Sequence, residues 1–197
     1  MTAKLAVLVS GGGRTLQNLL DQIAARSLDA AVQVVVASNS TAFGLERAKQ
    51  AGVDTAIVRR RDFETLEAFG EAITAVLDRY EIDLVIGAGF TQRYLFPPKF
   101  KGRCLHIHPA LLPRYGGQGM YGHHVHEAVL ASGDAESGCT VFIADHQYDT
   151  GPIVLQKRVP VLPGDTPETL AERVFEAEKQ AYPEAIRQVA HKLGLMI

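Results

Sequence analysis

Continuous apolar runs alternate along the first half of the chain with segments in which apolar residues recur every three or four positions. The apolar runs predict buried strands at 4–9, 32–37 and 83–88, with a shorter strand at 54–58. Helical spacing predicts helices at 16–25 and 42–51, and another that Asp62 caps and that extends to about residue 80. Apolar strands separated by amphipathic helices are typical of a parallel sheet covered on both faces.

The second half of the chain predicts three more strands and two more helices. Strands are expected at 103–107, 138–143 and 153–161, and a helix at 123–132. Thr166 and Pro167 mark the start of the last helix, because threonine caps helices and proline fits their first turn. Pro183 is a point at which that helix can be interrupted. Together the elements predict a three-layer α/β/α fold with a mostly parallel, twisted sheet.

Composition and charge narrow the class of protein. Of 197 residues, 47% are apolar and 21% are charged, which suits a single folded domain over 1–197. The net charge of −2 argues against a nucleic-acid-binding protein, which would usually carry a basic surface. No apolar run is long enough to span a bilayer, and the N-terminus lacks the regions of a signal peptide. With only two cysteines, too few for a disulfide framework, these features predict a cytoplasmic protein.

A glycine-rich loop, Gly11-Gly12-Gly13, separates the first strand from the first helix. Glycines let an anion approach the backbone closely, and the start of a helix offers unpaired N–H groups and a positive dipole end. Arg14 adds a cation at the same place. A dinucleotide site is disfavoured, because Leu16 stands where its third glycine would be and the second strand ends without an acid. The loop therefore predicts a monophosphate site, with a simple tight turn as the alternative.

Two histidines mark the end of the strand predicted at 103–107. Side chains alternate along a strand, so His106 and His108 are expected on one face, just before Pro109 ends the ladder. A histidine can donate a hydrogen bond to a developing oxyanion or move a proton, and a carboxylate such as Asp149 would raise its pKa. No serine has the sequence context of an activated nucleophile. The set therefore predicts direct transfer between two bound substrates, with oxyanion stabilisation rather than a covalent enzyme intermediate.

Two other interpretations of these histidines stay open. Both imidazoles can be structural, either hydrogen-bonded or facing solvent. Alternatively the chain can bind zinc, with ligands drawn from two His-x-His pairs and two aspartates, although this spacing is unspecific. Those ligands would be His106, His108, His124, His126 and Asp145 or Asp149.

Five short motifs are spread over nearly the whole chain: SGGG at 10–13, FGLERA at 43–48, AGF at 88–90, IHPALLP at 107–113 and DTGPI at 149–153. Together they resemble the glycinamide ribonucleotide (phosphoribosylglycinamide) formyltransferases, which belong to the folate-dependent formyltransferases. The His-Pro-x-Leu-Leu-Pro element is shared by that wider group. The glycine loop and the motif at 43–48 favour the glycinamide ribonucleotide enzyme over the methionyl-tRNA enzyme.

The resemblance implies a Rossmann-like formyltransferase fold and a reaction. That reaction is formyl transfer from 10-formyltetrahydrofolate, as co-substrate, to the amine of glycinamide ribonucleotide in de novo purine synthesis. His108 matches the family histidine that stabilises the tetrahedral oxyanion. Asp149 matches the aspartate that pairs with that histidine and assists proton transfer.

The resemblance also implies binding residues. The substrate phosphate would lie against the loop of Gly11, Gly12, Gly13, Arg14 and Thr15, and the ribose hydroxyls against Glu178. Two segments would form the walls of the folate pocket: Phe90, Thr91, Gln92, Arg93, Tyr94, Leu95, Asp145, His146, Gln147 and Tyr148. No metal is expected. The expected partners are the two small molecules, with neither nucleic acid nor membrane, and the chain would act as a monomer or homodimer.

Three features depart from the family pattern. His106 stands where the family has a catalytic asparagine, Arg14 and Thr15 replace small polar residues, and Leu66 stands where some members have an arginine. The first matters most, because asparagine always offers an N–H donor, whereas histidine does so only in the right tautomer or when protonated. The alternatives are a relative that acts on another phosphorylated amine, a formylfolate hydrolase, or a non-catalytic folate- or nucleotide-binding homologue. The retained histidine and aspartate argue against the last.

Overall fold

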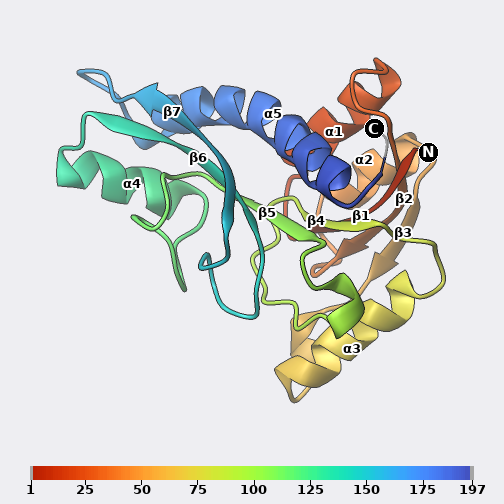
Figure 1. Ribbon diagram of the computed structural model, residues 1–197. Coiled ribbons are helices and arrows are strands. Elements are labelled where there is room, and N and C mark those ends of the chain that lie inside the picture. The colour runs from red at the N-terminus through yellow and green to blue at the C-terminus, as the bar shows by residue number, and fades with distance from the viewer. Residues whose placement is uncertain (1, 196–197) are drawn as a thin grey trace.

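A seven-stranded sheet runs through the centre of the computed structural model, which describes residues 2–195 (Figure 1). Its strand order is β3-β2-β1-β4-β5-β6-β7. The first five strands are parallel: β1 (Ala3–Val9), β2 (Ala30–Ala37), β3 (Asp54–Ile57), β4 (Leu84–Gly87) and β5 (Cys104–His108). The last two are antiparallel to their neighbours: β6 (Glu136–Ile143) and β7 (Ile153–Pro160). The prediction of a mostly parallel α/β sheet is confirmed.

Helices cover both faces of this sheet. They are α1 (Arg14–Ala24), α2 (Gly44–Gln50), α3 (Leu66–Leu77), α4 (His123–Ser132) and α5 (Pro167–Lys192). Alternation along β1 explains the two layers: Leu5, Val7 and Val9 belong to the core that packs against α1, α2 and α5, whereas Ala6 and Leu8 belong to the core that packs against α3. Figure 1 accordingly shows α3 on the opposite side of the sheet from α1, α2 and α5.

The start of α3 differs from the sequence prediction. Asp62 does not cap this helix, because it ends a separate 3-10 turn, where its carboxylate pairs with Arg59 Nε at 2.7 Å. Thr65 caps the helix instead, and its Oγ1 accepts a hydrogen bond from the N–H of Ala68 at 3.1 Å. Both residue types are good N-caps, and the extended backbone at Thr65 decides between them.

Helix α5 begins as predicted, with Thr166 Oγ1 accepting a hydrogen bond from the N–H of Thr169. It then continues through Pro183, so the interruption considered there does not occur. A proline leaves the carbonyl four residues earlier, that of Lys179, without its helical donor. The side-chain amide of Asn18 on α1 supplies one, with Nδ2 3.1 Å from the Lys179 oxygen. Packing of α1 against α5 therefore repairs a hydrogen bond that the local sequence would lose.

Asn18→Leu is expected to lower the free energy of unfolding by about 1–3 kcal/mol, because the partly buried carbonyl of Lys179 loses its side-chain donor. Equilibrium unfolding in urea would measure the change. Pro183→Ala restores a backbone N–H to the helix, so Asn18→Leu should cost less in that background. An equal cost in both backgrounds would show that the Asn18 amide does not compensate for Pro183.

Candidate active site

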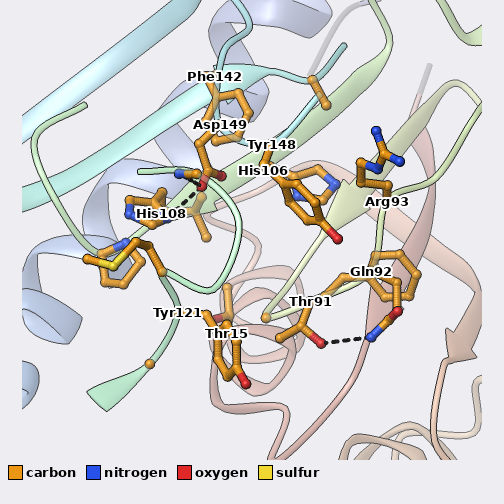
Figure 2. Close-up of a pocket in the computed structure, with 18 of the residues that line it drawn as sticks. Thr15, Thr91, Gln92, Arg93, His106, His108, Tyr121, Phe142, Tyr148 and Asp149 are labelled. Atoms are coloured by element: carbon orange, nitrogen blue, oxygen red, sulfur yellow. Dashed lines mark hydrogen bonds and ion pairs between the residues drawn. The ribbon is translucent and has the colours of Figure 1, made fainter. Parts of the chain in front are cut away.

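A cavity of about 590 Å³ lies beyond the carboxyl ends of β4 and β5, where parallel α/β sheets bind their ligands (Figure 2). Residues 89–94 and 106–109 line it from the sheet. The glycine-rich loop 117–122, the loop after β6 and one face of α5 complete its walls. Segments far apart in the sequence thus converge on one space.

His108 lies at the end of β5 and is only 4% exposed. Each of its two ring nitrogens faces one polar group. Its Nε2 is 2.7 Å from the carbonyl oxygen of Tyr115. A carbonyl can only accept, so Nε2 carries the proton and Nδ1 faces Asp149. Nδ1 lies 3.6 Å from Asp149 Oδ2. Burial lowers the pKa of His108, while the charge of Asp149 and the Tyr115 carbonyl act in the opposite direction.

Asp149 is held in place by the loops on both sides of the cavity. Its backbone has a φ of 56°, in the left-handed region that aspartate tolerates better than most residues. Its Oδ2 accepts a hydrogen bond from the N–H of Gly117 at 2.9 Å. Figure 2 shows the carboxylate directed toward His108. The structure therefore brings together the histidine and aspartate that the sequence selected, 41 positions apart by their numbering.

His106 also lines the cavity, from the same strand face as His108, as predicted. Burial lowers its pKa to about 4, opposed by the charge of Asp149. Its ring lies beside Phe142 on β6, with centroids 5.9 Å apart. His106 is therefore neutral near pH 7, which leaves it one N–H to donate.

The opposite end of the cavity carries a carboxyl and a cation. Burial raises the pKa of Glu178 to about 8, and the charge of Arg14 opposes that rise. The Arg14 guanidinium forms two hydrogen bonds to Glu172, at 2.6 and 2.7 Å, and lies 4.0 Å over the Phe175 ring. Arg14 and Thr15 line the cavity, as the sequence predicted for a phosphate site. The charge of Arg14 is, however, already shared with Glu172 in this structure.

The glycine loop lies beside that end of the cavity, at the start of α1. Gly13 is required by the fold, because it has a φ of 69° and a Cβ there would lie 2.6 Å from the Cα of Gly44. Gly11 and Gly12 are exposed, and a Cβ on either would meet nothing within 4 Å. Packing therefore does not explain these two glycines, which lie next to the lining residues Arg14 and Thr15 but do not themselves line the cavity.

Most of the residues expected in the folate walls line the cavity: Phe90, Thr91, Gln92, Arg93, Tyr94, Asp145, Gln147 and Tyr148. Leu95 and His146 are not among the lining residues. The Leu95 backbone packs against Gly70 on α3. The His146 Nε2 is 3.1 Å from the carbonyl oxygen of Phe96, and the two rings pack edge to face. The His146 ring therefore contacts the lining residue Phe96 rather than the cavity itself.

His126 on α4 lines the cavity, although its sequence context indicates only a candidate zinc ligand. It is 4% exposed, and its Nδ1 has no hydrogen-bond partner in the described part of the chain. Burial lowers its pKa to about 4, and the charges of His123 and His108 add to that effect. Met120 and Tyr121, from the glycine-rich loop, were also not assigned to the site and line the cavity.

Stability is expected to fall as the pH drops from about 6.5 toward 4. Burial lowers the pKa of His106 and His126 to about 4 and lowers that of His108, so below pH 6.5 the unfolded chain binds protons that the folded chain does not. Each such histidine contributes up to about 1.4 kcal/mol per pH unit. Glu178, whose pKa is raised to about 8, has the opposite effect, because here the folded chain binds the extra proton. Its contribution to stability rises as the pH falls and offsets the contribution of one histidine.

Urea unfolding at pH 7 and pH 5 would measure this difference. His126→Gln should reduce it, whereas the same change at the exposed His191 should not. Equal stability at the two pH values would contradict the expected burial of neutral histidines.

The zinc interpretation gains no geometric support. Within residues 2–195, no group of three or more histidine, cysteine, aspartate or glutamate side chains is arranged to hold a metal ion. His124 is exposed, and its Nδ1 lies 3.4 Å from Glu127 Oε2.

Within the described residues 2–195, no helix has both the length and the apolar character needed to cross a membrane.

The sequence and the fold are both similar to those of known proteins. The sequence matches the Formyl transferase family over residues 3–186. It is 37% identical over 182 residues to the phosphoribosylglycinamide formyltransferase of Escherichia coli (strain K12), an alignment covering 91% of this chain and 83% of that protein. It is also 37% identical to the trifunctional purine biosynthetic protein adenosine-3 of Drosophila melanogaster, but it spans only 14% of that protein's length.

The fold has close counterparts among solved structures. The crystal structure of glycinamide ribonucleotide transformylase 1 from Symbiobacterium toebii superposes with a TM-score of 0.89 at 37% sequence identity. The match covers 97% of this chain and 89% of the other.

Proposed function

This chain belongs to the formyl transferase family, and we propose that it transfers the formyl group of 10-formyltetrahydrofolate to the amine of glycinamide ribonucleotide. The observation that carries the proposal is the convergence of His106, His108 and Asp149 in one cavity. That cavity extends to Arg14, Thr15 and Glu178, beside a glycine loop suited to a phosphate. The names of the relatives support glycinamide ribonucleotide as the formyl acceptor and a role in purine synthesis.

The geometry of His108 suggests how it would act. Its Nε2 is committed to the Tyr115 carbonyl, while the 3.6 Å between Nδ1 and Asp149 exceeds a hydrogen bond. Nδ1 is therefore the nitrogen that can reach a formyl oxygen. The substrate amine attacks the formyl carbon, a C–N bond forms and the carbonyl π electrons move to oxygen. Protonated Nδ1 donates to this oxyanion, and the neutral His106 supplies a second donor.

Asp149 would support the charge on His108 and carry the proton. The amine must lose a proton, and the folate nitrogen must gain one when its bond to the formyl carbon breaks. A carboxylate that faces the reacting atoms can accept the first proton and return it to the leaving nitrogen. When the carbonyl re-forms, the products are the formylated amine and tetrahydrofolate.

The walls of the cavity suit a flat heteroaromatic ring. Its volume of about 590 Å³ lies within the usual range for small-molecule sites. Phe90, Tyr94, Phe96 and Phe142 supply aromatic surface. Backbone and side-chain polar groups of 91–93 and of the loop after β6 are available to the polar edge of the pteridine. We therefore place the folate there and the ribonucleotide toward Glu178 and the glycine loop.

Purified protein incubated with 10-formyltetrahydrofolate, with and without glycinamide ribonucleotide, tests the proposal. Folate absorbance would report formyl release, and mass spectrometry would identify the formylated product. Release that requires the amine supports the transfer. Release without it would identify a formylfolate hydrolase, and release only with another phosphorylated amine would change the acceptor. Tight folate binding without release would indicate a non-catalytic homologue.

Gly12→Val is expected to raise KM for glycinamide ribonucleotide by about tenfold or more, equivalent to about 1.4 kcal/mol of binding. The first carbon of the new side chain meets no obstacle in the folded protein, because a Cβ on Gly12 has nothing within 4 Å. It would instead occupy the space proposed for the phosphate. KM for the folate should stay within about twofold, and thermal unfolding should confirm an unchanged fold. Equal rises in both KM values would remove the glycine loop from phosphate binding.

A further inference from the structure

Gly87 is an unexpected residue at the end of a wholly buried strand. The other residues of β4 are Leu84, Val85 and Ile86, all buried. Glycine weakens a strand, because it contributes no packing and loses more backbone entropy on folding. The backbone does not require it either, since Gly87 is not among the glycines with positive φ. Some other feature must explain the missing side chain.

The missing side chain is replaced by the imidazole of His106. Gly87 and His106 are register partners on the parallel strands β4 and β5, so their side-chain positions share one face. A Cβ on Gly87 would lie 2.6 Å from Cδ2 of His106, 2.5 Å from Cε1 and closer still to Nε2. The distal edge of the ring therefore occupies the space that any other residue at 87 would fill.

The surroundings leave little freedom to relieve such a clash. Phe142, the register partner of His106 on β6, lies on the other side of the ring at 5.9 Å between centroids. Below the strands, the buried Tyr182 hydroxyl is 2.9 Å from the carbonyl oxygens of both Gly87 and Leu105. The phenol thus ties β4 and β5 together at this point. A methyl group at 87 would have to displace the ring rather than the backbone.

The position of the ring matters because of the residue that it replaces. The amide nitrogen of an asparagine and Nδ1 of a histidine are both attached to Cγ, at the same distance along the side chain. Cδ2 of the ring corresponds to the amide oxygen, so Cε1 and Nε2 are the two atoms that asparagine lacks, and they are the ring atoms that lie nearest to a Cβ on Gly87.

We propose that Gly87 is a positioning residue that accommodates the distal half of the His106 imidazole, so that Nδ1 takes the place of the family's asparagine amide. The inference rests on the proposed function, in which His106 supplies an oxyanion donor. It adds that the histidine works only in combination with a glycine on the neighbouring strand.

Four proteins test this: the wild type, Gly87→Ala, His106→Asn and the double variant. Gly87→Ala should lower kcat about tenfold or more, less than the roughly hundred- to thousandfold loss for removing one oxyanion donor, because the ring is displaced and not removed, with both KM values within about twofold. In the H106N background, the same alanine should change kcat by less than about twofold, because the shorter side chain leaves room for a Cβ. Loss of kcat in both backgrounds, or in neither, would overturn the proposal.

Two further measurements keep the test decisive. If Gly87→Ala fails to fold while the double variant folds, the rescue supports the steric pairing; failure of both would overturn it. A crystal structure of Gly87→Ala reports on the contact without any assay, so it separates this inference from the proposed reaction. A displaced His106 ring supports the inference even if the wild type transfers no formyl group, and an unmoved ring would overturn it.

Discussion

Asp149→Asn is expected to lower kcat by about a hundredfold or more, the range for losing a positioned acid–base partner, while the protein still folds. The amide oxygen can still accept the hydrogen bond from Gly117, so the loop keeps its anchor. The charge opposite His108 is lost. Burial lowers the pKa of His108 and the Asp149 charge raises it, so the pKa of His108 should fall further when the carboxylate becomes an amide. Less imidazolium would be present at any given pH, and no group would carry the proton.

Steady-state kinetics between pH 6 and 8 would measure the effect of Asp149→Asn. Asp145→Asn is the matched control, because it removes another carboxylate from the same loop. The Asp145 carboxylate accepts hydrogen bonds from within that loop, from the Gln147 N–H and from Thr150 Oγ1. That change should alter KM for the folate more than kcat. Near-normal turnover of Asp149→Asn would remove this carboxylate from the mechanism.

His106→Ala is expected to lower kcat by about ten- to a thousandfold, a range whose upper part is the loss for removing one oxyanion donor. His106→Asn should retain or improve activity, because it restores a donor that does not titrate. Burial lowers the pKa of His106 to about 4, so the neutral ring would keep one N–H to donate across the working pH range. His106 and His108 would repel each other if both were protonated, so the pair is expected to bind at most one additional proton, and Asp149 favours its place on His108.

Kinetics of both His106 variants would test this assignment. His123→Ala removes an exposed histidine that pairs with Glu127 on α4, and it serves as the control. An alanine variant with wild-type kcat would mean that His106 does not contact the reacting centre. An asparagine variant much worse than wild type would mean that this chain uses a second imidazole in a different way, with a different acceptor or reaction.

Local sequence was sufficient to predict the helices and strands and the strand face that carries the candidate catalytic histidines. Apolar runs and helical spacing depend on neighbours a few positions away, so they identified the strands of the parallel core and the helix at His123–Ser132. Alternation along a strand is equally local, and it placed His106 and His108 on one face. The order of strand, glycines and helix likewise indicated a loop with room for an anion. Asp149 was already a candidate partner from the residues alone, and the family motifs gave it an expected role in proton transfer.

Tertiary structure decided which side chains contact each other and which protonation state they have. Arg14 pairs with Glu172 on α5, Asn18 satisfies the carbonyl left open by Pro183, and the His106 ring rests over Gly87. These contacts join segments 19 to more than 150 positions apart by their numbering, and no pattern within one segment encodes them. Burial likewise depends on the assembled structure, and it lowers the pKa of His106 to about 4. Periodicity determines the face a side chain occupies, whereas its partner, protonation and available space follow from long-range packing.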